Sequence, residues 1–357
     1  MASLSVGLVG PPNCGKSTLF NALTGASTPV APHIFTTRES VHGVADVRDP
    51  RLDALARLSA SAKLVPTTLE VVDIAGLVSG SARGEGLGNA FLGQLRTTAA
   101  TLHVVRCFRD DSVATAGGPV DPTADADTVE LELVLADLAA VERRLERVRK
   151  EAKGGAAAVV AERDLLERLV GWLEQGRPAR TLAADPPQAV DLLTSKPTLY
   201  VANVDESGNR DDVQALERFA TERGSECVAV NAKLEAELAE LEPQEAAAFL
   251  EELGIERPAL ERISVAAQAM LDTIPFFTTG PKDTRAWTIR RGARAPQAAG
   301  AIHSDLERGF IRAEVIEWGR LVEAGSEAEA KRRGWVRVEG RDYVVKDGDV
   351  LNIRFNV

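Results

Sequence analysis

Residues 10–18 read Gly10-Pro-Pro-Asn-Cys-Gly-Lys-Ser-Thr18, and this stretch decides the fold class. It fits the pattern G-x-x-x-x-G-K-[S/T], in which the backbone N–H groups of a glycine-rich loop surround phosphate oxygens. An apolar run, Leu4–Val9, precedes the loop, and a helical pattern, Thr18–Leu23, follows it. Because a helix N-terminus also attracts negative charge, the three parts together predict a nucleotide phosphate site. A chance glycine-rich turn is the alternative.

The polar and small residues of this loop have expected roles in binding. We expect Lys16 to reach the β- and γ-phosphates and Ser17 to ligate Mg²⁺ through its hydroxyl. Cys14 lies at a helix N-terminus, where a thiolate is favoured, so its modification is expected to block binding. An inert small residue is the alternative for Cys14. The other loop residues expected to contact nucleotide are Asn13, Gly15 and Thr18.

A second phosphate-sensing motif, Asp73-Ile-Ala-Gly76, follows the apolar run Leu69–Val72. In switch proteins with a phosphate loop, such an Asp holds Mg²⁺ through water, and the Gly N–H faces the γ-phosphate. Between the two motifs, the hydroxyl of Thr37 is predicted to complete the Mg²⁺ shell. Thr36 is the alternative ligand, and a loop residue of high β-propensity without this role is another. The expected catalytic set is Lys16, Thr37, Asp73 and Gly76.

The element that recognises the base is expected after the next apolar strand, where the chain reads Asn203-Val-Asp-Glu206. The guanine-specific form is N-K-x-D, whose Asp accepts hydrogen bonds from two guanine N–H groups. Here Val204 replaces the Lys and Glu206 replaces the Asp, so the carboxylate lies one methylene too far out for guanine. Further along, Asn231 and Ala232 resemble part of the S-A-K loop that lines the base. The sequence therefore predicts ATP over GTP.

Hydrophobic periodicity predicts the organisation of the chain. Apolar runs alternate with helical stretches, which predicts an α/β fold with a mostly parallel sheet covered on both faces. From Thr128, a heptad pattern predicts an inserted antiparallel coiled-coil hairpin, with two ordinary surface helices as the alternative. Its seam is Leu131, Val134, Leu138, Val141, Leu145 and Val148. Short β-patterned runs follow Ile274. We expect a G-type domain at 1–127 and 196–274, the hairpin at 128–195 and a β-rich domain at 275–357.

Composition and charge limit the cellular compartments and the classes of partner that we expect. The 357 residues include three cysteines and carry a net charge of −11, which disfavours indiscriminate binding to DNA or RNA. No apolar run approaches the roughly 20 residues that span a bilayer. With no basic leader, the chain is expected to be cytoplasmic, away from membrane and DNA. Residues 275–357 hold 15 Lys and Arg against 12 Asp and Glu, which indicates a docking surface or ordinary drift in charge.

At this point the chain resembles the YchF-type Obg-like ATPases. The resemblance runs from end to end and is carried by the loop and helix 10–23, the motifs at 73–77, 84–89 and 203–206, and the C-terminal stretches 285–289, 295–300 and 346–357. It implies a coiled-coil insertion, a C-terminal TGS domain of β-grasp form and slow ATP hydrolysis with Mg²⁺. It also implies association with ribosomes and a role in translation or stress responses. The expected ribosomal contact is the large subunit, through the TGS and helical domains.

Two departures from the family pattern mean that no residue can be assigned to activate the attacking water. Leu77 stands where related enzymes place a water-orienting Gln, and the loop 107–115 contains no His, with Thr115 at the position where some relatives have one.

Asn13 resembles an Asn that helps to hold K⁺ beside the phosphates, so K⁺ is a second expected cofactor. A nucleotide-gated ribosome-binding module with incidental hydrolysis, or a GTPase, is the alternative function. The lone His303 is expected to be structural.

Overall fold

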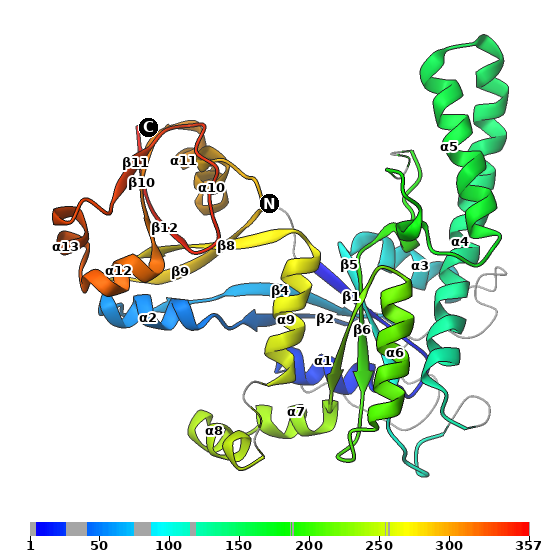
Figure 1. Ribbon diagram of the computed structural model, residues 1–357, viewed down its shortest axis with the longest axis horizontal. Coiled ribbons are helices and arrows are strands. Elements are labelled where there is room, and N and C mark those ends of the chain that lie inside the picture. Colours follow the sequence, from blue (N-terminus) through cyan, green and yellow to red (C-terminus); the bar gives the residue numbers. More distant parts are fainter. Residues whose placement is uncertain are drawn as a thin grey trace. The chain divides into compact units, whose positions relative to one another are not determined.

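The computed structural model describes residues 5–25, 41–74, 87–114, 119–185, 187, 189–253, 255 and 258–356. By internal packing the chain divides into two units, one formed by Ser5–Val44 and Glu70–Ile263, the other by Ala45–Leu69 and Ser264–Val357 (Figure 1). The predicted site residues Thr37 and Gly76 lie outside the described residues. No described helix is long and apolar enough to cross a membrane.

The first unit is built around a parallel sheet, as the apolar runs predict. Strands β1 and β5 are buried along their whole length, because apolar side chains occupy both faces. Strand β1 pairs in parallel with β4 and β5, and β6 pairs in parallel with β5 and β7. The sheet order is β2-β4-β1-β5-β6-β7, with β1 Ser5–Val9, β2 Val41–Val47, β4 Thr67–Asp73, β5 Ala100–Arg106, β6 Thr198–Asn203 and β7 Glu226–Val230.

Helices of this unit follow the strands and cover the sheet. Helix α1 follows the glycine-rich loop, and α3 contributes Phe91 and Leu95 to a buried cluster with Val9, Val72 and Ile74. Helices that connect consecutive strands of this sheet include α1 Lys16–Thr24, α3 Leu87–Thr97 and α6 Arg210–Glu222. Three more, α7 Ala232–Ala239, α8 Pro243–Glu252 and α9 Ala259–Met270, come after the last strand of this sheet. The predicted doubly covered α/β fold is confirmed.

The predicted helical hairpin is formed by α4 (Pro122–Glu151) and α5 (Ala157–Leu173), which lie side by side in Figure 1. Pro122 occupies the first helical position, and the Asp121 carboxylate caps α4 by accepting from two backbone N–H groups. The buried seam is Val134, Val141, Leu145, Val148, Leu166, Leu169 and Leu173. The seam thus confirms the heptad prediction in its central part.

The hairpin differs from its predicted limits in two ways. Helix α4 begins at Pro122, and its first turns join the sheet core through Val129, Leu133 and Ala136. Leu131, the first predicted seam residue, is 43% exposed. The cause is that one continuous helix carries two apolar stripes, one toward the sheet and one toward α5, and Leu131 lies on neither. The division between hairpin and nucleotide domain therefore falls inside a helix.

The second unit has a mixed sheet of β-grasp form. Strands β8 and β9 form an antiparallel hairpin, helices α10 (Ala295–Ile302) and α11 (Ser304–Arg308) follow, and the last strand, β12, lies parallel beside β8. The order is β11-β10-β12-β8-β9-β3, with β3 Leu64–Val65, β8 Thr273–Thr279, β9 Thr284–Arg290, β10 Phe310–Glu317, β11 Arg337–Glu339 and β12 Asp349–Phe355. His303 caps α11 by accepting from the Asp305 N–H at 3.2 Å, in agreement with its expected structural role.

Residues 45–69 pack differently from the sequence prediction, which placed them in the nucleotide domain. Leu52 and Leu55 of α2 (Pro50–Leu58) lie in one buried cluster with Phe277. Strand β3 adds to the edge of the C-terminal sheet, where it pairs in parallel with β9. An amphipathic helix shows in its sequence which face is buried but not which core covers it. The short helices α12 (Trp318–Ala324) and α13 (Glu327–Arg332) complete this unit.

Candidate nucleotide-binding site

The loop between β1 and α1 has a backbone that only glycine fits at two positions. Gly10 has φ +152° and Gly15 has φ +97°, in the region that residues with a side chain avoid. A Cβ at Gly10 would lie 2.2 Å from the carbonyl oxygen of Val104, and one at Gly15 would lie 2.1 Å from Nδ2 of Asn203. The loop therefore has the close backbone approach that a phosphate cradle requires.

Lys16 begins α1 and is 8% exposed. Its Nζ donates to the carbonyl oxygens of Gly10, at 2.9 Å, and Pro11, at 2.7 Å. These contacts hold the ammonium group across the loop, beside the helix N-terminus. A buried cation at this place provides the charge that phosphate oxygens need.

Ser17 and Asp73 bring two oxygen donors together. The Ser17 hydroxyl donates to Oδ2 of Asp73 at 2.8 Å, although the residues are 56 positions apart. Burial raises the pKa of the Asp73 carboxyl, and the hydrogen bond from Ser17 and the charge of Lys16 oppose that rise. A hydroxyl and a carboxylate next to a phosphate cradle fit Mg²⁺, which prefers oxygen ligands and is usually held by one or two carboxylates together with phosphates.

Asn203 joins the phosphate loop to the base-recognition loops. Its side chain is buried at the end of β6, where Nδ2 donates to the carbonyl oxygen of Cys14 at 2.9 Å. Its Oδ1 accepts from the backbone N–H of Ala232 at 3.1 Å. One amide thus links three segments that the chain separates by 29 and 189 positions. The sequence prediction places these residues at one site, and the structure brings them together.

A cleft of about 580 Å³ extends from this loop toward the base-recognition residues. Its rim carries two adjacent carboxylates with different surroundings. Asp205 accepts from the N–H groups of Arg109 and Ser207, both at 2.9 Å, and hydrogen bonds led by the Ser207 hydroxyl lower its pKa to about 2. Glu206 is exposed. The lining residues are Gly15, Thr18, Phe108, Arg109, Asp110, Val113, Asn203, Val204, Asp205, Glu206, Ser207, Asn231 and Lys233.

Asn231 and Val204, two predicted nucleotide-binding residues, use some of their polar groups in hydrogen bonds within the protein. Oδ1 of Asn231 accepts from Leu234 N–H at 3.0 Å and so caps α7. The N–H of Val204 donates to the Val230 carbonyl oxygen at 2.8 Å. Both residues line the cleft, but these groups hold its wall together.

Sequence reasoning missed the wall contributed by the loop after β5. Arg106 organises this loop, since its guanidinium donates to the carbonyl oxygens of Asp110, at 3.0 Å, and Val113, at 3.1 Å. It also lies over the ring of Phe108, with Cζ 4.5 Å from the ring centroid. The available signal was position: this loop follows a buried parallel strand, and ligands of such sheets bind at the carboxyl ends of the strands.

The surroundings of Asn13 and Cys14 bear on the roles that the sequence suggests for them. Asn13 has φ +59°, and its Nδ2 donates to the carbonyl oxygen of Ala114 at 3.2 Å. Cys14 is fully buried, and burial raises the pKa of its thiol despite the opposing charge of Lys16. The expectation that the helix N-terminus favours a thiolate at Cys14 is therefore wrong, because loss of solvation outweighs the helix end.

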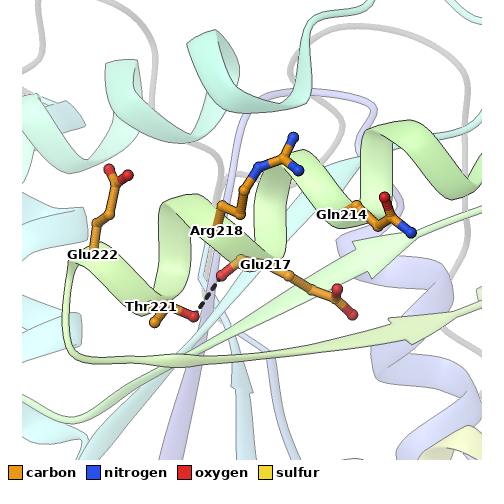
Figure 2. Close-up of a pocket in the computed structure, with 5 residues that line it drawn as sticks. All are labelled: Gln214, Glu217, Arg218, Thr221 and Glu222. Atoms are coloured by element: carbon orange, nitrogen blue, oxygen red, sulfur yellow. Dashed lines mark hydrogen bonds between the residues drawn. The ribbon is translucent and has the colours of Figure 1, made fainter.

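A second hollow lies on α6 and is not a comparable site. Figure 2 shows its five lining residues, of which Arg218 and Glu222 point to one side and Glu217 to another. All five come from one helix and are exposed, and the hydroxyl of Thr221 donates to the helix's own Glu217 carbonyl oxygen at 2.8 Å. In the cleft, polar groups from separate elements converge, whereas this hollow is lined by one helix alone.

Two family models match separate parts of the chain. Residues 5–134 match a family model described as a 50S ribosome-binding GTPase. Residues 273–356 match the C-terminal model of the YchF GTPases, described as a protein of unknown function. The chain is 46% identical to a protein of Haemophilus influenzae named ribosome-binding ATPase YchF, over 98% of this chain and 99% of that protein. The protein of the same name from Bacillus subtilis is also 46% identical, over 99% of this chain and 100% of its own.

Solved structures give the same picture of the fold. The structure of the Schizosaccharomyces pombe YchF GTPase superposes with a TM-score of 0.83 at 32% identity, covering 99% of this chain and 98% of that one. A GTP-binding protein from Pyrococcus horikoshii superposes with a TM-score of 0.59 at 18% identity, covering 99% and 100%, which shows likeness of fold alone.

Proposed function

This chain belongs to the YchF family, and on that premise we propose that it is a ribosome-binding ATPase that hydrolyses ATP slowly with Mg²⁺. The observation that carries the proposal is the difference between the two ends of its cleft. At the phosphate end, Lys16, Ser17 and Asp73 provide a buried ammonium group, a hydroxyl and a carboxylate around the loop. At the base end, Glu206 occupies the position of the Asp that would read guanine, and its carboxylate lies one methylene further out.

Each residue at the phosphate end has a proposed task. Lys16 binds the β- and γ-phosphates, exchanging its contacts with loop carbonyl oxygens for phosphate oxygens. Ser17 and Asp73 would hold Mg²⁺. Outside the described residues, Thr37 would add a further ligand and the Gly76 N–H would face the γ-phosphate. Mg²⁺ held there would neutralise negative charge on the phosphates. With Leu77 next to Gly76, no side chain at that position orients the attacking water, which agrees with slow turnover.

The base end favours ATP because it lacks the carboxylate geometry that binds guanine. An Asp at position 206 would accept two hydrogen bonds from guanine, each worth about 1.5–3 kcal/mol when the acceptor is charged. The longer Glu206 loses that geometry, and Asp205 is held in its own turn by Ser207 and Arg109. Removing an ideally placed carboxylate also removes its repulsion from the adenine N1 lone pair. The outcome is a modest preference for ATP with residual GTP binding.

Ribosome binding is proposed from the names of the relatives. The model matching residues 5–134 is described as a 50S ribosome-binding GTPase, which supports the large subunit as partner. We place this contact on the hairpin and the C-terminal unit, and the protein in the cytoplasm, where ribosomes work. K⁺ beside Asn13 is proposed as an additional cofactor, and its first expected sign is higher turnover in K⁺ than in Na⁺ at matched ionic strength.

Nucleotide titration and turnover test the proposal together. Dissociation constants for ATP and GTP are measured on the full chain, followed by ATP turnover with and without purified ribosomes. We expect tighter ATP binding, turnover stimulated by ribosomes, and loss of turnover in Lys16→Ala and Asp73→Asn. A dissociation constant for GTP tenfold lower than that for ATP would show that the protein is a GTPase instead. Ribosome binding that needs ATP but persists unchanged in a variant without hydrolysis would favour the nucleotide-gated module.

A further inference from the structure

Helix α8 carries an apolar stripe that the described protein does not bury. Ala246, Phe249, Leu250 and Leu253 recur at spacings of three, four and seven, so they share one side of the helix. Phe249 is 40% exposed and Leu253 is 48% exposed. Every α8 side chain that the structure describes is exposed or half-buried. In Figure 1 the helix lies beyond α7, at the lower left.

An uncovered stripe of this kind is physically unusual. A helix of ten residues is marginal in water by itself, and most helical stability in proteins comes from packing an apolar side against something. A cluster of exposed apolar residues edged by polar ones marks an interaction surface more often than a single exposed Leu does. A partner that covers Phe249 and Leu253 would supply the missing packing.

The charge around the stripe indicates the chemistry of that partner. Residues 234–253 contain seven Glu and no Lys or Arg. Glu235 is buried and accepts from the N–H of Ala259, whereas the other six are exposed: Glu237, Glu240, Glu242, Glu245, Glu251 and Glu252. In the part of the chain that the structure describes, none of these six forms an ion pair with Lys or Arg. Carboxylates on α5 differ, since Glu162 and Glu167 pair with Arg144 and Arg149.

The geometry of α8 places part of this charge beside the stripe. Glu245 and Glu252 are seven residues apart, two helical turns, so both flank the same side of the apolar stripe. We define the α8 face as Glu245, Ala246, Phe249, Leu250, Glu252 and Leu253. Such a face has apolar anchoring points with a row of anionic side chains along one edge.

We propose that the α8 face docks a basic amphipathic segment of a protein partner. Apolar side chains of that segment cover Phe249 and Leu253, and its Lys or Arg side chains pair with Glu245 and Glu252. Nucleic acid is disfavoured as occupant, because its phosphates would meet unpaired carboxylates. Where the partner is the ribosome, this inference rests on the proposed function and assigns the α8 face to ribosomal protein, not to RNA.

The first experiment does not depend on ribosomes. A fluorescent peptide of about 18 residues, with Leu on one helical side and Lys on its flanks, is titrated with the full chain by fluorescence anisotropy. We compare the parent with Phe249→Ser/Leu253→Ser and with Glu245→Lys/Glu252→Lys. The matched control is Glu217→Lys/Glu222→Lys, which reverses two exposed carboxylates on α6 of the same unit. Thermal unfolding and ATP binding of every variant confirm that it is folded.

The expected result is selective weakening. Both α8 variants should bind the peptide about tenfold more weakly, and the α6 control should change by less than about twofold. Equal weakening in the α6 control would show attraction to overall negative charge and would overturn the proposal. Unchanged affinity in the two α8 variants would overturn it as well.

A second experiment identifies the contact on purified ribosomes. Phe249 is replaced by photoreactive benzoylphenylalanine in the full chain, which is irradiated with ribosomes and analysed after nuclease digestion. We expect a cross-link to a Lys- and Arg-rich protein segment. A cross-link to RNA, to a second copy of the chain or to its own C-terminal unit would contradict the proposal. Failure of the parent chain to sediment with ribosomes would refute the proposed function, while the peptide titration would still decide the α8 face.

Discussion

The two ends of the nucleotide cleft are built by different means. At the phosphate end, contacts come from the backbone: Gly10 and Gly15 adopt positive φ, and Lys16 is held by carbonyl oxygens. At the base end, contacts come from side chains on a rim, where Asp205 is engaged in its own turn and Glu206 is exposed. A backbone cradle accepts few substitutions, whereas a rim of side chains can change which base it prefers without disturbing the fold.

The largest effect is expected from Gly15→Ala. The new Cβ would lie 2.1 Å from Nδ2 of Asn203 at φ +97°, so Asn203 must move and both of its hydrogen bonds weaken. Strain of about 1–3 kcal/mol adds to that loss. We expect ATP to bind at least about 100-fold more weakly by calorimetry, since each 1.4 kcal/mol is a factor of ten.

Gly25→Ala is the control for that substitution. Gly25 has φ +64° at the end of α1, but nothing lies within 4 Å of a Cβ built there. It should cost stability through strain and leave ATP affinity within about twofold. If both variants bind ATP equally well, the phosphate end does not depend on the close approach described above.

Asn203→Ala should weaken the connection between the two ends. It removes the donor to the Cys14 carbonyl oxygen and the acceptor for Ala232 N–H, two buried hydrogen bonds worth about 1 kcal/mol each. We expect ATP and GTP affinity to fall together by about tenfold to thirtyfold. Loss confined to one nucleotide would mean that Asn203 reads the base and does not bridge the loops.

Glu206→Asp should sharpen the difference by acting on the base end alone. The shorter side chain restores a carboxylate where guanine donates, so GTP affinity should rise and the ATP-to-GTP ratio should fall about tenfold. ATP affinity and turnover are measured in parallel. Glu217→Asp on α6 is the control, and the same change in ratio there, or none in Glu206→Asp, would move base recognition away from residue 206.

The smallest effect on nucleotide binding is expected from His103→Phe in the sheet. Burial lowers the pKa of His103 to about 3, and its ring stacks on Tyr200 with centroids 5.0 Å apart. Because the unfolded chain binds a proton near pH 6.5 and the folded chain does not, stability is full above that pH and falls as pH decreases toward 3.

Urea unfolding at pH 7 and pH 5 measures the contribution of His103 to the free energy of unfolding. Between the two, the parent should lose about 2 kcal/mol more than His103→Phe, which keeps a stacking ring without the proton. A parent curve that matches His103→Phe would show that His103 takes up its proton without unfolding.

The sequence was sufficient where local pattern determines structure. The loop 10–18 with its flanking strand and helix, the buried parallel strands and the seam from Val134 to Val148 all follow from spacing that a short window contains. It was insufficient where two patterns compete or a partner is distant. Leu131 fits a heptad but lies between two stripes of one helix, and Cys14 lies at a helix end but is desolvated. The wall at Phe108 has no residue pattern of its own.

The placement of residues 45–69 has a consequence for synthesis of the chain. Among the described residues, the cluster that buries Leu52 and Leu55 of α2 and the strand that pairs with β3 come from residues 264–357, which are translated much later. At roughly 5–20 residues per second, the interval is on the order of 10–40 seconds, during which Leu52 and Leu55 have no core to enter. A nascent or prematurely terminated chain is therefore expected to expose the apolar side of α2, as a chaperone substrate does.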